Sequence, residues 1–244
     1  DIYANELLIG EKVQKSLLPK TVPHFPGLDI AVHFISAKEV GGDFYDFLSN
    51  DKLMITIADT SGKGISACLY SLSVRSMLRS YGEIHHKLDR IVNETNNLFC
   101  LDTGDTGVFV TAFVAFYEPI SRIFQYTNCG HLPAICIRKS GEVEKLTTSG
   151  MALGVAHFQQ ISTNQIKLED GDLLVLLTDG ILEAHNIEQE FFGERRLINL
   201  LKEKRHLSAQ RIVDELIKEI DVFTSGASQH DDITLLVMRI SLLP

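Results

Sequence analysis

Four aspartates lie at the edges of apolar segments, and their residue type and placement suggest metal chemistry. They are Asp43, Asp59, Asp179 and Asp231. Each lies where a hydrophobic, strand-like run begins or ends, and strand ends can converge at one edge of a sheet. Several carboxylates held close together repel one another. A hard divalent cation such as Mg²⁺ or Mn²⁺ removes that repulsion and favours carboxylate oxygens. The pattern therefore predicts a carboxylate-rich metal site.

Each aspartate also has a simpler interpretation when taken alone. An aspartate before a glycine often forms a turn, and one before a helix often caps it. Asp179, followed by Gly180 and the apolar Ile181, could be such a cap. The four contexts taken together favour the metal site, because Gly42 beside Asp43 and Gly180 beside Asp179 would let the backbone approach an ion closely.

Composition limits the function classes. The chain has 244 residues, of which 45% are hydrophobic, enough for one large domain with a core. Its net charge of −9 argues against general nucleic-acid binding, because neutralising phosphates requires clustered Lys and Arg. The only dense basic cluster, Lys202 to Arg205, is expected to be a solvated helix face.

The cysteines and the chain ends indicate a cytoplasmic setting. Four cysteines without a C-x-x-C pair are expected to be buried, reduced thiols. No segment has the length and apolarity of a membrane span, and no signal peptide is visible. We therefore expect a cytoplasmic protein or, because the sequence starts at Asp1 and not at Met, the cytoplasmic part of a longer, membrane-attached sensor protein.

The secondary-structure pattern predicts an α+β fold. Strands joined by short turns favour mainly antiparallel pairing, and the helices fall in separate blocks. Helices are predicted at 5–18, 64–81 (with Gly82 as the stop), 87–99, 194–203 and 208–223. Strands are predicted at 28–36, 44–48, 53–58, 108–117, 122–127, 134–138, 143–146, 161–168, 172–177 and 233–240.

Other catalytic motifs are absent from the sequence. The Gly62-Lys63-Gly64 segment is not a P-loop, because Ile57 and Gly64 stand where that motif needs a glycine and a Ser or Thr. Neither H-E-x-x-H nor G-x-S-x-G occurs. His131, a lone histidine at a strand end, is expected to orient a loop rather than bind a metal.

An ordered set of segments resembles the metal-dependent type-2C (PPM) protein phosphatases, in particular their bacterial SpoIIE/RsbU-like branch. The resemblance covers nearly the whole chain. It is carried by the segments 16–19 (SLLP), 39–46 (EVGGDFYD), 59–64 (DTSGKG), 109–111 (FVT), 128–131 (NCGH), 154–155 (GV), 171–172 (GD), 178–180 (TDG), 191–194 (FFGE) and 231–234 (DDIT).

The resemblance implies an α-β-β-α sandwich of two mainly antiparallel sheets with a centre of two Mn²⁺ or Mg²⁺ ions. Asp59 resembles the ligand shared by both ions, and Thr60 would offer its backbone carbonyl. Asp179 and Asp231 resemble the remaining ligands of one ion. Asp43 resembles an acidic residue that binds a metal or holds its water. Around these ligands, the resemblance places Gly42, Gly180 and Asp232.

The implied activity is that of a protein serine/threonine phosphatase. Its implied substrate is a phosphorylated, STAS-like anti-sigma-factor antagonist in a bacterial partner-switching pathway. No nucleophile constellation is present, which fits hydrolysis by an activated water without a phosphoenzyme. Two alternatives stay open: a catalytically inactive binding module in the same pathway, and a phosphatase for a small phosphate ester.

The N-terminal segment is expected to be a separate regulatory element. We divide the chain into a linker helix, residues 1–23, and a phosphatase domain, residues 24–244. Tyr3, Leu7 and Leu17 give the helix an apolar stripe that Gln14 interrupts. The stripe would either pack on its own domain or form a homodimer that relays a signal from an upstream sensor domain.

Overall fold

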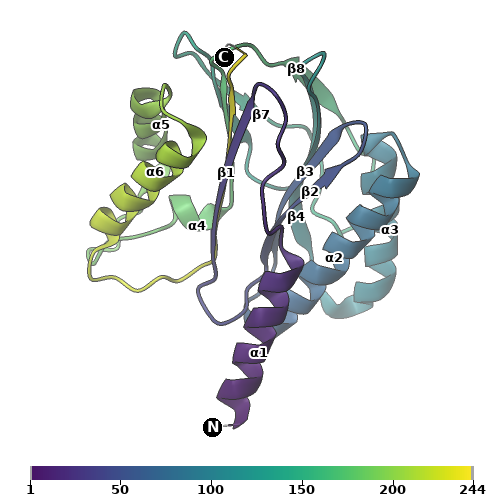
Figure 1. The fold of residues 1–244 in the computed structure, drawn as a ribbon. Helices are drawn as coiled ribbons and strands as arrows, with labels where there is room; N and C mark the ends of the chain where they lie inside the picture. Colours follow the sequence, from purple (N-terminus) through teal and green to yellow (C-terminus); the bar gives the residue numbers. More distant parts are fainter. Residues whose placement is uncertain (1, 243–244) are drawn as a thin grey trace. The chain divides into compact units, whose positions relative to one another are not determined.

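The computed structural model describes residues 2–242, which form two compact units. Unit 1 contains the chain up to Thr21, Lys38–Leu132 and Thr147–Lys167. Unit 2 contains Val22–Ala37, Pro133–Leu146 and the chain from Leu168 onward. Each unit is built on one five-stranded antiparallel sheet with helices packed against it (Figure 1). The predicted α+β class with mainly antiparallel sheets flanked by helices is therefore confirmed.

The elements of unit 1 are α1 (Ile2–Leu17), β2 (Asp43–Ser49), β3 (Leu53–Thr60), α2 (Gly64–Ile84), α3 (Leu88–Thr103), the 3₁₀ turn η1 (Gly104–Thr106), β4 (Val110–Glu118), β5 (Ile123–Cys129) and β8 (Asn164–Lys167). Those of unit 2 are β1 (Leu28–Ile35), β6 (Ala134–Ile137), β7 (Val143–Leu146), β9 (Leu173–Leu177), α4 (Asp179–Leu182), α5 (Gly193–Lys204), α6 (Ala209–Thr224) and β10 (Ile233–Ile240). Within the described residues, no helix combines the length and apolarity that crossing a membrane requires.

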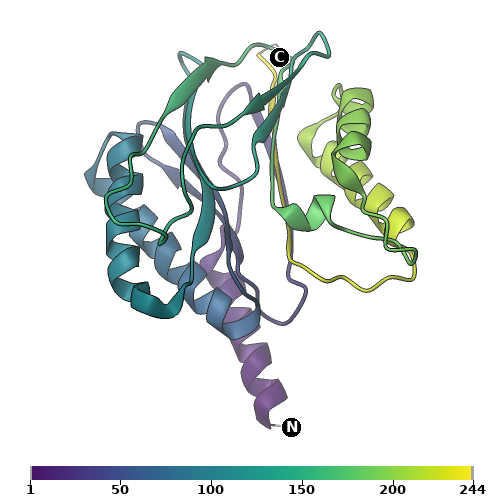
Figure 2. The ribbon, with the colours of Figure 1, turned by 180° about the vertical axis from the view of Figure 1, so that it is seen from behind.

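The sheet of unit 1 has the strand order β2-β3-β4-β5-β8. In β3 the six residues from Leu53 to Ala58 are all buried, which is typical of a central strand covered on both faces. Helices α2 and α3 lie side by side against this sheet (Figures 1 and 2). Their buried side chains, among them Val74, Ile91 and Phe99, form the core that fixes the sheet's register.

Gly82 does not end α2, as the sequence pattern had predicted. The helix continues for two residues to Ile84, and Gly82 lies inside it. A β-carbon at Gly82 would come within 2.9 Å of Leu48 Cδ2 and 3.2 Å of Met54 Sδ. The glycine is therefore required by the close approach of helix and sheet rather than by a helix stop.

Helix α1 contacts its own unit through one face. Gln14 is 3% exposed, and its side chain donates to the carbonyl of Gly41 at 2.7 Å and accepts from the Gly41 amide at 3.2 Å. Gln14 therefore anchors the helix instead of interrupting its packing. On another face, Ile2, Ile9 and Val13 remain 50–76% exposed.

The sheet of unit 2 has the strand order β1-β10-β9-β6-β7. All five residues of β9 are buried, as are all residues of β10 except Arg239. Helices α5 and α6 pack on each other, and α6 covers β1 and β10 (Figure 1). Because β9 and β10 run antiparallel, the end of β9 lies beside the start of β10.

A buried carboxylate organises the turn before β9. Asp172 is 2% exposed and accepts from the amides of Glu169 (2.8 Å) and Lys139 (3.2 Å) and from Arg138 Nη1 (2.7 Å). The pKa of Arg138 is affected most by its burial, which lowers it, but its bonds to Glu144 and Asp172 outweigh burial and leave that pKa raised. This network connects the β6–β7 hairpin to β9.

We expect Asp172→Ala to lower the free energy of unfolding by about 3 kcal/mol, because it leaves two backbone amides without their acceptor and removes one of the two carboxylates that bind the partly buried Arg138. Urea unfolding followed by circular dichroism would measure the change. The control is Glu142→Ala, an exposed carboxylate in the same hairpin, which should change stability by less than about 0.5 kcal/mol. Equal stability of the two variants would contradict a structural role for Asp172.

Candidate metal centre

Unit 1 places two of the predicted ligands directly opposite each other. In the antiparallel pairing of β2 with β3, Asp43 is the partner of Asp59. Directly opposite residues point to the same face of a sheet, with β-carbons about 5 Å apart. Asp43 is 1% exposed, whereas Asp59 is half-buried. Two like charges in this position are unfavourable unless positive charge joins them, so the pair fits a divalent cation.

The backbone around this pair is tightly packed. The amide of Thr60 donates to the carbonyl of Gly42 at 3.1 Å. A β-carbon at Gly42 would lie 2.9 Å from Ala67 Cβ and 3.1 Å from the Thr60 carbonyl oxygen. Only glycine fits there without displacing that carbonyl, which is the group that the sequence resemblance assigned to a metal.

A hydrogen-bond chain connects His131 to Asp59. The Thr111 hydroxyl donates to the Asp59 carbonyl at 3.3 Å, and its oxygen lies 2.9 Å from His131 Nδ1. A hydroxyl has a single proton, so His131 completes this chain when Nδ1 carries a hydrogen and donates it to Thr111. The contact agrees with the loop-orienting role that the sequence predicted for His131.

Unit 2 brings together the other two predicted ligands. Asp179 follows the end of β9, and Asp231 comes just before the start of β10. The two strand ends are joined by hydrogen bonds from the Thr178 amide to the Thr234 carbonyl and from the Thr234 amide to the Thr178 hydroxyl, both 3.1 Å. The antiparallel pairing of the two strands therefore places both aspartates at one edge of the sheet.

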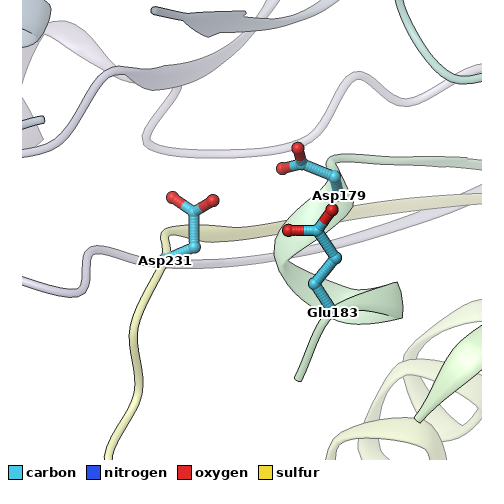
Figure 3. A group of neighbouring side chains, drawn as sticks. All are labelled: Asp179, Glu183 and Asp231. Carbon is cyan, nitrogen blue, oxygen red and sulfur yellow. The ribbon is translucent and has the colours of Figure 1, made fainter. Parts of the chain in front are cut away.

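A third carboxylate, which the sequence analysis did not identify, completes this cluster. Glu183 follows Asp179 by four residues, directly after the end of α4, and one oxygen each from Asp179, Glu183 and Asp231 lie within 4.8 Å of one another. Figure 3 shows the three carboxylates directed toward one another: Asp179 from the start of α4, Glu183 from the residue just after it, and Asp231 from the segment before β10. The i, i+4 spacing of Asp179 and Glu183 was the available sequence signal.

The unit 2 cluster has the properties of a cation site. Asp179 Oδ1 is buried and has no hydrogen-bond partner among residues 2–242. A buried carboxylate oxygen without a hydrogen-bond partner is unfavourable in free energy, and a bound cation would remove that penalty. A β-carbon at Gly180 would lie 1.9 Å from the Asp232 carbonyl oxygen, so only glycine lets α4 start this close to β10.

Asp232 has a different environment from its neighbour Asp231. It is 8% exposed, and its Oδ1 accepts from the Ala37 amide at 2.9 Å. Its own amide donates to Asp231 Oδ1 at 2.9 Å. Asp232 thus holds the segment after β1 and orients the Asp231 carboxylate.

The family of the chain follows from comparison with known proteins. The sequence model described as Stage II sporulation protein E (SpoIIE) matches residues 49–241. The chain belongs to the SpoIIE family. It is 31% identical to phosphoserine phosphatase RsbU of Bacillus subtilis (strain 168) over 241 residues, which cover 96% of this chain and 70% of that protein. The relatives that it matches are longer, and the chain spans between 24 and 70% of their lengths.

Solved structures show the same fold. The SiaA-PP2C domain of Pseudomonas aeruginosa matches with a TM-score of 0.86 and 20% identity, covering 98% of this chain and 97% of that one. The RsbU and RsbW domains of Rv1364c from Mycobacterium tuberculosis match with a TM-score of 0.78 and 24% identity, covering 92% and 64%. The catalytic domain of phosphatase PstP, in complex with two manganese ions, matches with a TM-score of 0.65 and 15% identity, covering 88% and 98%.

These findings confirm the SpoIIE/RsbU-like branch of the PPM phosphatases as the family of this chain. They also confirm the predicted enzyme class, a protein serine/threonine phosphatase, and the PP2C-type fold. The acidic cluster fits a metal-dependent phosphatase. The assignment of individual ligands stays a prediction.

We expect Asp179→Asn to remove the stabilisation that Mn²⁺ gives to the protein while leaving the metal-free fold intact or slightly more stable, because one repelling charge is gone. When Mn²⁺ is present at 100 times its dissociation constant, the free energy of unfolding of the wild-type protein should rise by about 2.7 kcal/mol. Thermal unfolding with and without Mn²⁺ would measure both effects. Glu188→Gln, an exposed carboxylate beyond α4, is the control and should respond like wild type. An undiminished Mn²⁺ response in Asp179→Asn would exclude Asp179 as a ligand.

Proposed function

We propose that this chain is a phosphatase domain that removes phosphate from a phosphorylated serine or threonine of a protein in the cytoplasm, using two Mn²⁺ or Mg²⁺ ions. The observation that carries this proposal is the presence of two carboxylate clusters. In unit 1, Asp43 lies opposite Asp59. In unit 2, oxygens of Asp179, Glu183 and Asp231 lie within 4.8 Å of one another. In unit 1 the carbonyl of Thr60 adds a further oxygen ligand. PstP, with its two manganese ions, supports the number of ions.

The chemistry of these residues suits phosphate hydrolysis. When bound, divalent ions would activate a water and stabilise the charge of the phosphoryl oxygens. The proposed ligands of these ions in this chain are all oxygen atoms. Thr111 fixes the backbone at Asp59, and Asp232 fixes Asp231, so the protein limits movement of the ligands themselves.

The proposed substrate is a phosphorylated, STAS-like antagonist of an anti-sigma factor. RsbU, whose name describes a phosphoserine phosphatase, supports a phosphoserine substrate. Rv1364c supports a partner-switching pathway because RsbU and RsbW domains occur together in that protein. The net charge of −9 on this chain fits a protein substrate better than a nucleic acid.

The two alternatives make different demands on the site. An inactive binding module would have no need for a buried carboxylate oxygen that lacks a hydrogen-bond partner, yet Asp179 Oδ1 has no such partner among residues 2–242. A small-ester phosphatase would hydrolyse a small phosphate ester as fast as a phosphoprotein. A direct assay therefore separates all three functions.

We expect release of phosphate from a serine-phosphorylated STAS-domain protein only when Mn²⁺ or Mg²⁺ is present. Asp59→Asn should lower the rate by more than about 100-fold, because removing a metal ligand should reduce activity more than removing a residue that only hydrogen-bonds to a ligand. Thiol alkylation should have no effect, since burial raises the pKa of Cys129 and of Cys136 to about 12.

Three controls decide the outcome of this assay. Glu188→Gln should retain full activity, and para-nitrophenyl phosphate should be a poorer substrate than the phosphoprotein. Activity in excess EDTA, or near-wild-type turnover of Asp59→Asn, would reject the metal assignment. Binding of the STAS protein without any phosphate release would instead favour the inactive module.

Helix α1 supports a proposed homodimer. Ile2, Ile9 and Val13 are spaced by seven and four residues, which places them on one side of the helix. Each is at least half exposed. An apolar stripe of this kind fits a second copy of the helix. On another face Gln14 bonds to Gly41, two residues before Asp43, so a change in helix packing would reach the loop that carries this ligand. An upstream sensor domain could use this connection.

We expect Ile9→Glu to shift the protein from dimer to monomer in sedimentation velocity, because it places charge in the centre of the stripe. Ala4→Glu adds the same charge on another, exposed side of the helix and should leave the mass unchanged. Point variants are preferable to removal of residues 1–18, which would also remove the contact of Gln14 with Gly41. A monomeric wild-type protein, or equal masses for the two variants, would exclude pairing through this stripe.

A further inference from the structure

A basic pocket lies in unit 2, at the end of the sheet away from the carboxylate cluster. It has a volume of about 510 Å³, and the polar side chains that line it are Lys139, Asp170, Arg205, His206, Arg239 and Ser241. Asp170 precedes β9, whereas Asp179 follows it, and Arg239 lies near the end of β10, whereas Asp231 precedes its start. The five residues of β9 separate the two sites by about 17 Å.

Backbone carbonyls bind the two arginines of this pocket, and the stem of Lys139 lies along the backbone. Gly171 has a φ of +84°, and a β-carbon there would meet the aliphatic stem of Lys139 at 3.0 Å, so the lysine lies against a bare backbone. Arg239 Nε donates to the Arg205 carbonyl at 3.3 Å, and Arg205 Nη1 donates to the Lys202 carbonyl. Arg205 is half-buried and lines the pocket, while Lys202 in the same basic cluster is exposed.

Positive charge exceeds negative charge in the pocket. Among residues 2–242, Asp170 is the only carboxylate that lines the pocket; its Oδ2 lies 3.8 Å from Lys139 Nζ, and its Oδ1 accepts from the Leu242 amide at 2.9 Å. Within residues 2–242, neither Arg205 nor Arg239 has a carboxylate within ion-pair distance. Three cations against one anion, in a chain of net charge −9, create a local field that attracts anions.

We propose that this pocket binds a small anion of the phosphate class, such as an organic di- or polyphosphate. Guanidinium groups bind phosphate oxygens through pairs of parallel hydrogen bonds, and a lysine adds a point charge. The volume lies in the range of small-molecule sites, roughly 300–1,000 Å³, so the pocket has room for more than one phosphate group. The site is independent of the carboxylate cluster and of the proposed phosphatase activity.

Calorimetric titration of the full chain with inorganic pyrophosphate, in EDTA and at low ionic strength, tests this proposal. Chelation removes divalent ions, so the probe cannot bind through a metal. We expect saturable binding of one anion per chain, weakened by added salt. Arg205→Gln should weaken it by about tenfold or more, since a paired charge-assisted contact is lost. Lys139→Gln, at a side chain that is 74% exposed and so tolerant of change, should weaken it less.

Two control variants locate the binding. Lys202→Gln removes an exposed charge from α5, three residues before Arg205 and outside the pocket lining, and Asp179→Asn alters the carboxylate cluster; both variants should bind pyrophosphate like wild type. A nucleoside diphosphate titrated in parallel shows whether an organic group adds affinity to that of pyrophosphate. Absence of saturable binding at millimolar pyrophosphate would overturn the proposal. So would equal losses in Arg205→Gln and Lys202→Gln, which indicate general charge attraction.

Discussion

The pairing of antiparallel strands is the constraint on which both carboxylate groups depend. In unit 1 the register that pairs Phe44 with Ala58 also sets Asp43 opposite Asp59. A slip of one residue would turn every side chain of the strand to the other face, so the buried core and the acidic pair are fixed together. In unit 2 the pairing of β9 with β10 acts in the same way for Asp179 and Asp231. The apolar sequence of the strands therefore determines the geometry of the charges at their ends.

The two carboxylate clusters lower the stability of the metal-free fold, and the apolar core must offset that loss. Like charges held close together oppose folding, and a buried carboxylate oxygen without a partner adds to that opposition. The buried apolar residues of β3, β9 and β10 supply the favourable contribution, since burial of apolar surface is the main driving force of folding. A bound cation would make the electrostatic contribution of these carboxylates to folding favourable. Metal binding and stability should therefore be linked in this family of sites.

The sequence revealed most of the fold and the four aspartates, but not the features that depend on contacts distant in sequence. The strands and long helices follow from periodicity. Gly82 was predicted to end α2 because a glycine near the end of a helix often marks its last residue. The sequence did not show that Gly82 lies where the helix closely approaches the sheet. Gln14 looked like a break in an apolar stripe because its partner, Gly41, lies 27 residues away. Glu183 was overlooked because the short helix that places it beside Asp179 is stabilised by the neighbouring strand β10, not by its own sequence.

The segment from Asn128 to His131 shows how residues outside the two carboxylate groups can still influence the position of a proposed ligand. The Asn128 side chain donates to the carbonyls of His131 and Leu132 and accepts from the His131 amide, closing the turn after β5. Gly130, at a φ of +69°, allows that turn to approach the Ala152 amide, where a β-carbon would lie at 2.9 Å. The turn presents His131 to Thr111, and Thr111 bonds to the backbone of Asp59. A loop far along the chain thus fixes the strand end that carries a proposed ligand, so His131 can affect the site through Thr111 and the backbone of Asp59.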